Sequence, residues 1–201
     1  MAAEVSKDEL MEDLARRVEE CRRCPLYASR RRAVVGEGSL DALVMFVGEA
    51  PGYYEDLKGR PFVGAAGKVL DRLLDEIGLR REEVYITNIV KSRPPKNRDP
   101  QEGEIEACSS YLDEQLEIIK PRVVAPLGRF STKYIMIKFG LRPAPISRVH
   151  GRPFDASAPY GTVVIFPLYH PAVALYRGGM EEVLFGDIKR LGEALSSRGY
   201  I

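Results

Sequence analysis

The sequence has few of the features that mark secreted, membrane-spanning or polyanion-coating proteins. Among 201 residues it contains 3 cysteines and 2 histidines, and its formal net charge is only +1. No apolar run is long enough to cross a membrane, and the first ten residues, MAAEVSKDEL, are charged without an apolar core. We therefore expect no signal peptide, no membrane partner and a reducing, cytoplasmic location. The near-neutral charge argues against non-specific coating of polyanions but is compatible with a local basic groove.

Three cysteines are an odd number for disulfide pairing in a reducing compartment, and thiols or metal ligands are the more natural interpretation. Cys21 and Cys24 form the motif CRRC, and Cys108 follows far along the chain. CRRC alone is a weak signal, because it is compatible with a redox pair, with half of a zinc site or with no special role.

Length and composition predict one globular domain. Hydrophobic residues make up 45% of the chain and charged residues 29%, which is ordinary for a folded protein. A chain of 201 residues can bury one core well but is short for two. We expect a single domain over residues 1–201, in which residues 1–33 form an N-terminal helix and the CxxC segment.

Alternating strand and helix patterns predict the fold class. Helices are expected over about 6–21, 64–79, 101–120, 130–139 and 180–197, and strands over 43–47, 84–89, 123–127 and 162–166. The stretch 141–159, broken by glycine and proline, is expected to hold short antiparallel pieces. Because parallel neighbours need crossover connections, this order predicts an α/β three-layer sandwich with a central four-stranded parallel sheet and helices on both faces.

The stretch from Leu43 to Gly64, LVMFVGEAPGYYEDLKGRPFVG, is the best candidate for a functional loop. It starts with an unbroken apolar run, which is typical of a strand buried on both faces. The run stops at a turn that holds Glu49 between glycines and a proline. Ligands of open α/β sheets bind at the carboxyl ends of the strands, so Glu49 is expected at such an edge. A plain strand-to-helix turn with a solvated glutamate is the alternative.

Other polar side chains follow the same pattern. Asn88 ends the second predicted strand, and His170 follows the fourth in the motif YHPA, so both are expected at the edge that holds Glu49. Asn88 offers a planar amide that can read a polar edge, and His170 can serve catalysis; a turn asparagine and a structural histidine are the alternatives. Phe62 is either a core aromatic, which is the default, or a stacking plate beside the loop.

Four motifs occur in order along the chain: VGEAPGYYEDLKGRPFVGAAGKVLDRLL, VYITNIVKSRPPKNRDP, PLGR and YHPA. In this order and spacing they closely resemble the family 4 uracil-DNA glycosylases, the thermostable type that carries an iron–sulfur cluster. The resemblance runs from about Cys21 to Arg177, and only residues 141–159 have no clear anchor. It implies a DNA-repair enzyme that flips uracil out of DNA and hydrolyses its N-glycosidic bond to leave an abasic site.

The resemblance also implies roles at the predicted edge. His170 and Glu49 match catalytic positions: the histidine donates a hydrogen bond to O2 of the departing uracil, and the glutamate orients the attacking water or stabilises the cationic sugar. Asn88 matches the residue that reads the edge of uracil. Phe62 matches the aromatic on which the flipped base stacks.

Further substrate contacts follow from the same resemblance. The backbone amide of Ala50 is a second contact to the base, and Glu55 matches the position that crowds the C5 methyl of thymine. Leu175 would wedge into the duplex and Arg177 would contact a phosphate, with ordinary loop packing as the alternative for both. The expected partners are uracil-containing DNA, single- or double-stranded, and free uracil as product, for a protein that acts as a monomer.

The family ligates a [4Fe-4S] cluster with a CxxC pair and two further cysteines. Cys21, Cys24 and Cys108 match three of these ligands, but Ser92 stands at the fourth position, and serine is a harder ligand than thiolate. The open interpretations are a serinate or outside ligand at one iron, a three-iron cluster, an engineered substitution, or no cluster. We favour a retained structural cluster that ties residues 1–33 to the core.

The leading hypothesis is a monofunctional uracil-DNA glycosylase without a lyase step or a catalytic metal. The alternative is a non-catalytic iron–sulfur protein that binds uracil-containing or damaged DNA. A flavodoxin-like mononucleotide binder would rest on the sheet and the glycines alone, because neither GxGxxG nor a P-loop is present. A related family traps DNA covalently through an inserted loop, and KSRPPKNRDP has no such insertion, so no covalent adduct is expected.

Overall fold

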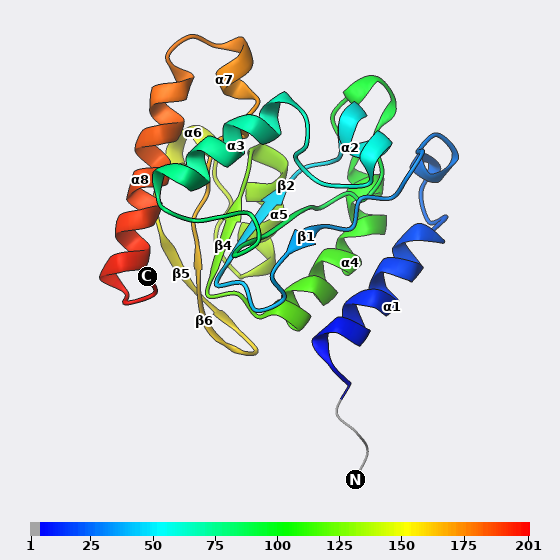
Figure 1. Cartoon of the computed structure of the whole chain (residues 1–201), viewed down its shortest axis with the longest axis horizontal. Helices are drawn as coiled ribbons and strands as arrows, with labels where there is room; N and C mark the ends of the chain where they lie inside the picture. Colours follow the sequence, from blue (N-terminus) through cyan, green and yellow to red (C-terminus); the bar gives the residue numbers. More distant parts are fainter. Residues whose placement is uncertain (1–4) are drawn as a thin grey trace.

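The computed structural model describes residues 5–201, so the first four residues of the MAAEVSKDEL segment lie outside the described part (Figure 1). The helices are α1 (Lys7–Glu19), α2 (Tyr53–Lys58), α3 (Ala65–Glu76), α4 (Glu102–Ile119), α5 (Arg129–Lys138), α6 (Ile146–Val149), α7 (Val173–Tyr176), α8 (Met180–Ser197) and the 3₁₀ turns η1 (Pro25–Ala28) and η2 (Pro95–Asn97). The strands are β1 (Glu37–Gly38), β2 (Val44–Gly48), β3 (Tyr85–Asn88), β4 (Val123–Pro126), β5 (Phe154–Ala158) and β6 (Gly161–Ile165).

The strands form one mixed six-stranded sheet in the order β1-β3-β2-β4-β6-β5. The central four strands are parallel, whereas β1 and β5 run antiparallel to their neighbours at the two edges. The α/β class is therefore confirmed, but a sheet of four parallel strands is not. β1 was missed because two residues carry no alternating pattern. β5 lies in the stretch 141–159, where antiparallel pieces were predicted but not assigned to the sheet.

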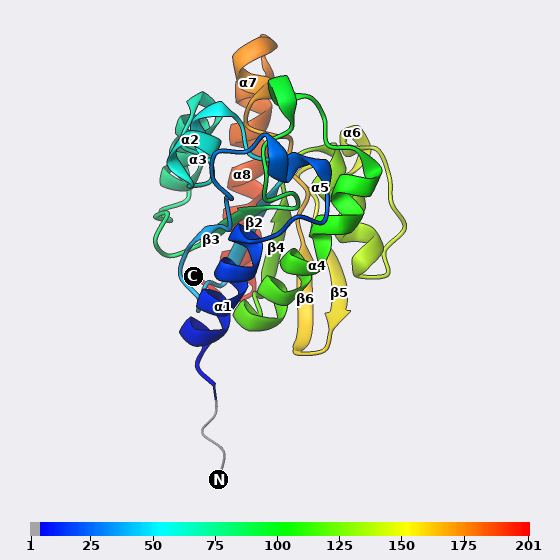
Figure 2. The same cartoon turned by 90° about the vertical axis from the view of Figure 1, so that its right-hand side faces the viewer.

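Helices cover both faces of the sheet (Figures 1 and 2). α3 and α8 pack against one face, which receives Val44 and Phe46 of β2. α4 and α5 pack against the other face, which receives Met45 and Val47. Because successive side chains of a strand point to opposite faces, the unbroken apolar run of β2 fills both cores at once.

The N-terminal helix packs beside α4, and its Met11 also contacts Tyr85 of β3. Ser6 caps α1, because its hydroxyl accepts from the backbone N–H of Glu9 while the Glu9 carboxylate accepts from the backbone N–H of Ser6. The buried face of α1 presents Leu14 and Val18 to a cluster that also contains Cys108 of α4. This packing brings the CRRC segment, which follows α1, to the side of α4.

Sheet pairing continues to the edge where the predicted polar residues lie. Gly48 of β2 pairs with Asn88 of β3, and an isolated parallel bridge joins Leu127 to Leu168 beyond β4 and β6. The carboxyl ends of the four parallel strands therefore meet at one edge. Within residues 5–201, no helix is both long and apolar enough to cross a membrane.

Candidate active site

A pocket of about 570 Å³ opens at the carboxyl ends of the parallel strands. Seven residues singled out from the sequence line it: Glu49, Ala50, Glu55, Phe62, Asn88, His170 and Arg177. Leu175 is not among the lining residues and is 44% exposed. The sequence-based prediction that strand-end residues share one site is consistent with this geometry, although the role of each residue stays a prediction.

Gly48, the last residue of β2, lies directly against two of these residues. A Cβ atom at this position would lie 2.2 Å from Oδ1 of Asn88 and 2.8 Å from the ring of Phe62. Both distances are far shorter than a van der Waals contact. The missing side chain is therefore what allows Asn88 and Phe62 to lie against the same strand end.

Glu49 is held at the start of α5. Its Oε1 atom accepts a hydrogen bond from the backbone N–H of Phe130 at 3.2 Å, in the first turn of the helix. Burial raises the pKa of the Glu49 carboxyl above its ordinary value, and the nearby Asp99 adds to this rise. Gly128, at φ +95°, makes room for this arrangement, since a Cβ there would lie 2.4 Å from Oε1 of Glu49 and 3.2 Å from Cβ of His170. Glu49 and His170 thus both lie against Gly128.

His170 lies in the pocket as a neutral imidazole. Burial lowers the pKa of His170 to about 4, so the ring is uncharged at neutral pH. Its Nδ1 accepts from the backbone N–H of Ala172 at 3.2 Å, which leaves the proton on Nε2. The ring also stacks on Phe62 with centroids 5.5 Å apart. His170 can therefore donate one hydrogen bond from Nε2 without carrying a positive charge.

Asn88 is 2% exposed at the end of β3, and a buried lysine holds its backbone. Nζ of Lys91 donates to the carbonyl of Asn88 at 2.7 Å, to Oγ1 of Thr87 at 2.7 Å and to Oε1 of Gln115 at 2.6 Å. Burial lowers the pKa of Lys91 to about 7. Sequence reasoning missed this residue, because a lysine after a strand usually indicates a solvated loop.

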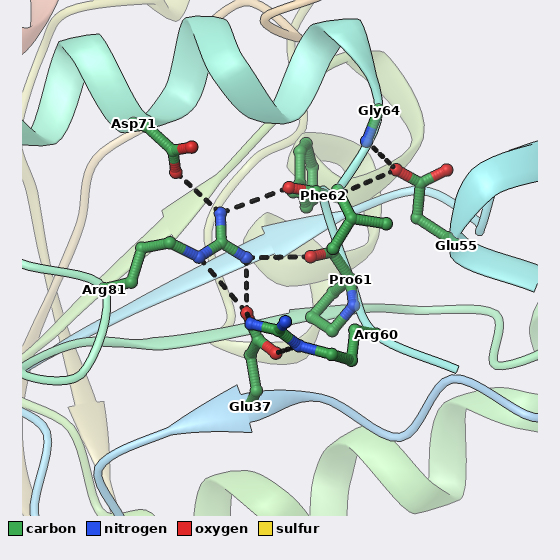
Figure 3. A network of polar contacts seen from close by, with 9 residues as sticks. Glu37, Glu55, Arg60, Pro61, Phe62, Gly64, Asp71 and Arg81 are labelled. Carbon is green, nitrogen blue, oxygen red and sulfur yellow. Dashed lines mark hydrogen bonds and ion pairs between the residues drawn. The ribbon is translucent and has the colours of Figure 1, made fainter. Parts of the chain in front are cut away.

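Phe62 is both a core residue and a wall of the pocket. It is 6% exposed and belongs to the core between the sheet and α3, so the two sequence interpretations are compatible. The Glu55 carboxylate accepts from the backbone N–H groups of Val63 and Gly64, each at 2.9 Å (Figure 3). It also accepts from the backbone N–H of Gly52 at 3.1 Å. Glu55 therefore fixes the loop, while its predicted contact with the C5 face of a base is untested.

The rim of the pocket contains an aromatic residue that sequence reasoning missed. Tyr176, at the end of α7, is 83% exposed and lines the pocket next to Arg177. An exposed aromatic beside an arginine is a signal of nucleic-acid stacking, and it was available in the motif ALYR. Tyr176 is better placed than Leu175 to contact a chain that enters the pocket.

The predicted cluster ligands line a second, narrow pocket between the CRRC segment and α4. Cys21, Cys24, Cys108 and Ser92 all contribute to its wall. The Cys108 thiol accepts from the backbone N–H of Lys91 at 3.2 Å, and the Ser92 hydroxyl accepts from Nη1 of Arg30 at 2.9 Å. The tertiary structure thus gathers three thiols and one hydroxyl from three separate segments.

This donor set fits an iron–sulfur group at three positions and departs from it at the fourth. Three thiols with basic neighbours suit an anionic cluster, whereas the Ser92 hydroxyl is already engaged by Arg30. In the described part of the chain, no group of three or more His, Cys, Asp or Glu side chains is arranged to hold a single metal ion. The cluster is therefore a proposal.

Comparison with known proteins identifies the superfamily of the chain. Residues 35–188 match the family model of the Uracil DNA glycosylase superfamily. The chain belongs to this superfamily. It is 48% identical to the type-4 uracil-DNA glycosylase of Sulfurisphaera tokodaii over 192 residues, which cover 94% of this chain and 87% of the relative.

Two further type-4 uracil-DNA glycosylases are also similar to this chain over most of its length. The Archaeoglobus fulgidus protein is 48% identical over 92% of this chain and 93% of its own length. The Thermotoga maritima protein is 41% identical over 96% of this chain and 99% of its own length. The superfamily match starts at residue 35, after the CRRC segment, whereas these relatives extend the similarity over nearly the whole chain. The resemblance predicted from the motifs is confirmed.

Proposed function

We propose that this protein is a DNA-repair glycosylase, which binds a uracil flipped out of DNA in the strand-end pocket and hydrolyses its N-glycosidic bond to leave an abasic site. One observation carries the proposal: side chains from separate strand ends, Glu49, Asn88 and His170, converge with Phe62 on one pocket. The type-4 relatives, by their names, support the same activity.

Base recognition is assigned to Phe62 and Asn88. A base inside a duplex is out of reach of any pocket, so the nucleotide must rotate out and stack on an aromatic surface. The carbonyl of Asn88 accepts from N3–H of uracil while its amide donates to O4. Cytosine presents the opposite pattern, so an amide held in one orientation rejects it. Its nearly complete burial and the Lys91 contact to its backbone support a fixed orientation.

His170 acts on the leaving group. Cleavage breaks the C1′–N1 bond with its electron pair moving to uracil, so negative charge develops on O2. The Nε2–H of neutral His170 donates to this oxygen, and a donor of this kind contributes roughly 3 to 4 kcal/mol. The lowered pKa supports this role, because a neutral ring can be buried without the free-energy cost of desolvating a charge and still has one N–H to donate.

Glu49 acts on the sugar side of the bond. The carboxylate accepts a hydrogen bond from the attacking water and lies near the cationic sugar, so that the water oxygen bonds to C1′ and one proton of the water passes to the Glu49 carboxylate. The raised pKa supports proton acceptance, since it makes this carboxylate more basic than an ordinary one. The same negative charge stabilises the oxocarbenium-like sugar.

Contacts to DNA are assigned to the rim. Tyr176 stacks on or wedges between bases next to the flipped nucleotide, with Leu175 as a packing neighbour, and Arg177 contacts a phosphate. The exposure of Tyr176 and the position of Arg177 in the pocket wall support this assignment. The amide of Ala50 contributes a further base contact, and Glu55 limits the space beside C5.

We also propose that Cys21, Cys24 and Cys108 hold an iron–sulfur cluster. When bound, such a group supplies a structural cross-link between the N-terminal segment and α4 and takes no part in bond cleavage. The gathering of the three thiols in one pocket supports the proposal. In this arrangement residues 1–33 and the core form a single domain.

An assay on a uracil-containing oligonucleotide tests the function. Purified protein is incubated with single- and double-stranded substrates, and alkali then cleaves abasic sites; free uracil is measured in parallel. Strand cleavage only after alkali is the expected result for a glycosylase without lyase activity. Tight binding with neither abasic sites nor free uracil would replace the proposal by the non-catalytic alternative.

A further inference from the structure

The loop that carries Phe62 has an unusual backbone. Phe62 has φ +49°, in the left-handed region that residues with a side chain rarely adopt. A bulky residue stays there only when its surroundings enforce the conformation. The Phe62 ring forms a wall of the strand-end pocket. The contacts that hold the backbone of Phe62 in this conformation therefore also set the position of the ring.

Two charged side chains grip this loop from opposite sides (Figure 3). Arg81, in the turn before β3, donates from Nη2 to the carbonyl of Pro61 at 2.8 Å and from Nη1 to the carbonyl of Phe62 at 3.2 Å. Glu55 accepts from the backbone N–H groups of Val63 and Gly64 on the other side. A cation thus holds the carbonyls and an anion holds the amides of one short loop.

Arg81 is itself fixed by two carboxylates. Its Nη1 pairs with Oδ1 of Asp71 in α3 at 2.8 Å, and its Nη2 pairs with Oε1 of Glu37 in β1 at 2.5 Å. The planar guanidinium therefore donates to four groups, which lie in the Phe62 loop, α3 and β1. A lysine ammonium cannot reach all four together. Its side chain is 21% exposed, so water competes little for these bonds.

We propose that Arg81 is a positioning residue for the reaction, which holds the Phe62 ring in the strand-end pocket by fixing the backbone of Pro61 and Phe62. Arg81 and Glu55, which bind this loop from opposite sides, together form a clamp. Arg81 touches neither the base nor the reacting atoms in this scheme. The inference rests on the proposed function insofar as it concerns uracil, whereas its conformational part concerns the loop alone.

The chain offers a matched control in Arg60. Arg60 pairs with the same Glu37, through Nε to Oε2 at 2.6 Å, but its side chain is 62% exposed and it donates to neither loop carbonyl. Arg81→Met and Arg60→Met both remove an arginine from Glu37. Only the first removes the hold on Pro61 and Phe62.

A double-mutant cycle tests the proposal through kcat and KM on a uracil-containing oligonucleotide. Arg81→Met is expected to lower kcat about 10- to 100-fold with little change in KM, because a displaced ring misplaces the base relative to His170 while contacts to the DNA backbone persist. Arg60→Met should stay close to wild type. In a Phe62→Ala background, Arg81→Met should have almost no further effect, since both changes act through one ring. Equal loss from Arg81→Met with and without Phe62 would overturn the proposal, as would a matching loss in Arg60→Met.

Amide hydrogen exchange over residues 62–64 gives a readout that needs no activity. Exchange should speed up in Arg81→Met and not in Arg60→Met, and unchanged exchange in Arg81→Met refutes the clamp. A wild-type protein that releases no uracil would refute the proposed function separately, and the exchange result would still decide the clamp. If Arg81→Met does not fold, Arg81→Lys takes its place, because it keeps the charge but cannot reach all four groups; wild-type kcat and wild-type exchange in Arg81→Lys would then overturn the proposal.

Discussion

The strand-end pocket and the cysteine pocket are assembled from the chain in different ways. Glu49 and Asn88 stand on the ends of neighbouring parallel strands, so sheet hydrogen bonds fix the backbone on which they are carried. The thiols instead come from a turn after α1 and from the face of α4, which are joined by side-chain packing. The first pocket therefore depends on backbone geometry, and the second depends on the identity of each side chain.

The two pockets meet at one residue. Lys91 donates from its backbone to the thiol of Cys108 and from its side chain to the carbonyl of Asn88. The two pockets differ in how they accommodate a change of side chain. Arg30 satisfies the hydroxyl of Ser92 in the cysteine pocket, whereas Gly48 leaves no room for even one additional carbon beneath Asn88. Four experiments test this contrast between the two pockets.

His170→Ala should have the largest effect. Removing one preorganised donor at the developing anion is expected to lower kcat about 100- to 1,000-fold, while the thermal unfolding midpoint changes little because the ring faces the pocket. Single-turnover rates and thermal denaturation measure the two quantities. Turnover near the wild-type rate would remove His170 from the chemistry.

Gly48→Ala should follow closely. The added Cβ collides with Oδ1 of Asn88 and with the Phe62 ring, so the pocket must deform and uracil release should fall at least about 10-fold. Gly103→Ala is the matched control: its Cβ meets no atom within 4 Å, and the change should leave the rate unaltered. Equal rates in the two variants would show that the strand-end backbone tolerates change.

The pH dependence should report Glu49. Because burial raises its pKa, the carboxylate gains its proton at a higher pH than an ordinary glutamate, and kcat should fall as pH drops through that raised value. His170 keeps its neutral form until about pH 4, so it does not cause this loss. Glu49→Gln should be slower and lack the acid limb in single-turnover rates. An unchanged acid limb in Glu49→Gln would assign it to another group.

Ser92→Cys should have the smallest effect on activity and a clear effect on the metal. A fourth thiolate is expected to raise the iron and sulfide content per chain and the visible absorbance. The kcat should stay close to wild type, because the cysteine pocket lies outside the strand-end pocket. Ser92→Ala serves as control, since it removes the hydroxyl without adding a ligand. Equal iron content in all three proteins would argue against a ligand at this position.

Much of the molecule could be predicted from local patterns. The unbroken apolar run of β2 and the order of the motifs each depend on neighbouring residues only, and they predicted this central strand and the superfamily, while α1 was expected over residues 6–21. β1, α2, α6 and α7 were not predicted, and β5 was expected only as an antiparallel piece without a place in the sheet. They are short, and pairing or packing with distant segments stabilises them rather than their own sequence.

The alternation of strands and helices, and the positions of Glu49, Asn88 and His170 at or after strand ends, could be inferred from the residues alone. How these side chains and the Phe62 loop are held became visible in the fold: Lys91 donates to Asn88, Arg81 and Glu55 hold the Phe62 loop, and Arg30 donates to Ser92. Each of these contacts joins a charged side chain to a backbone or hydroxyl group, and its spacing follows neither the helix nor the strand period. Such bonds leave no periodic trace in the sequence, because their geometry depends on how the packed helices, strands and loops place the two partners.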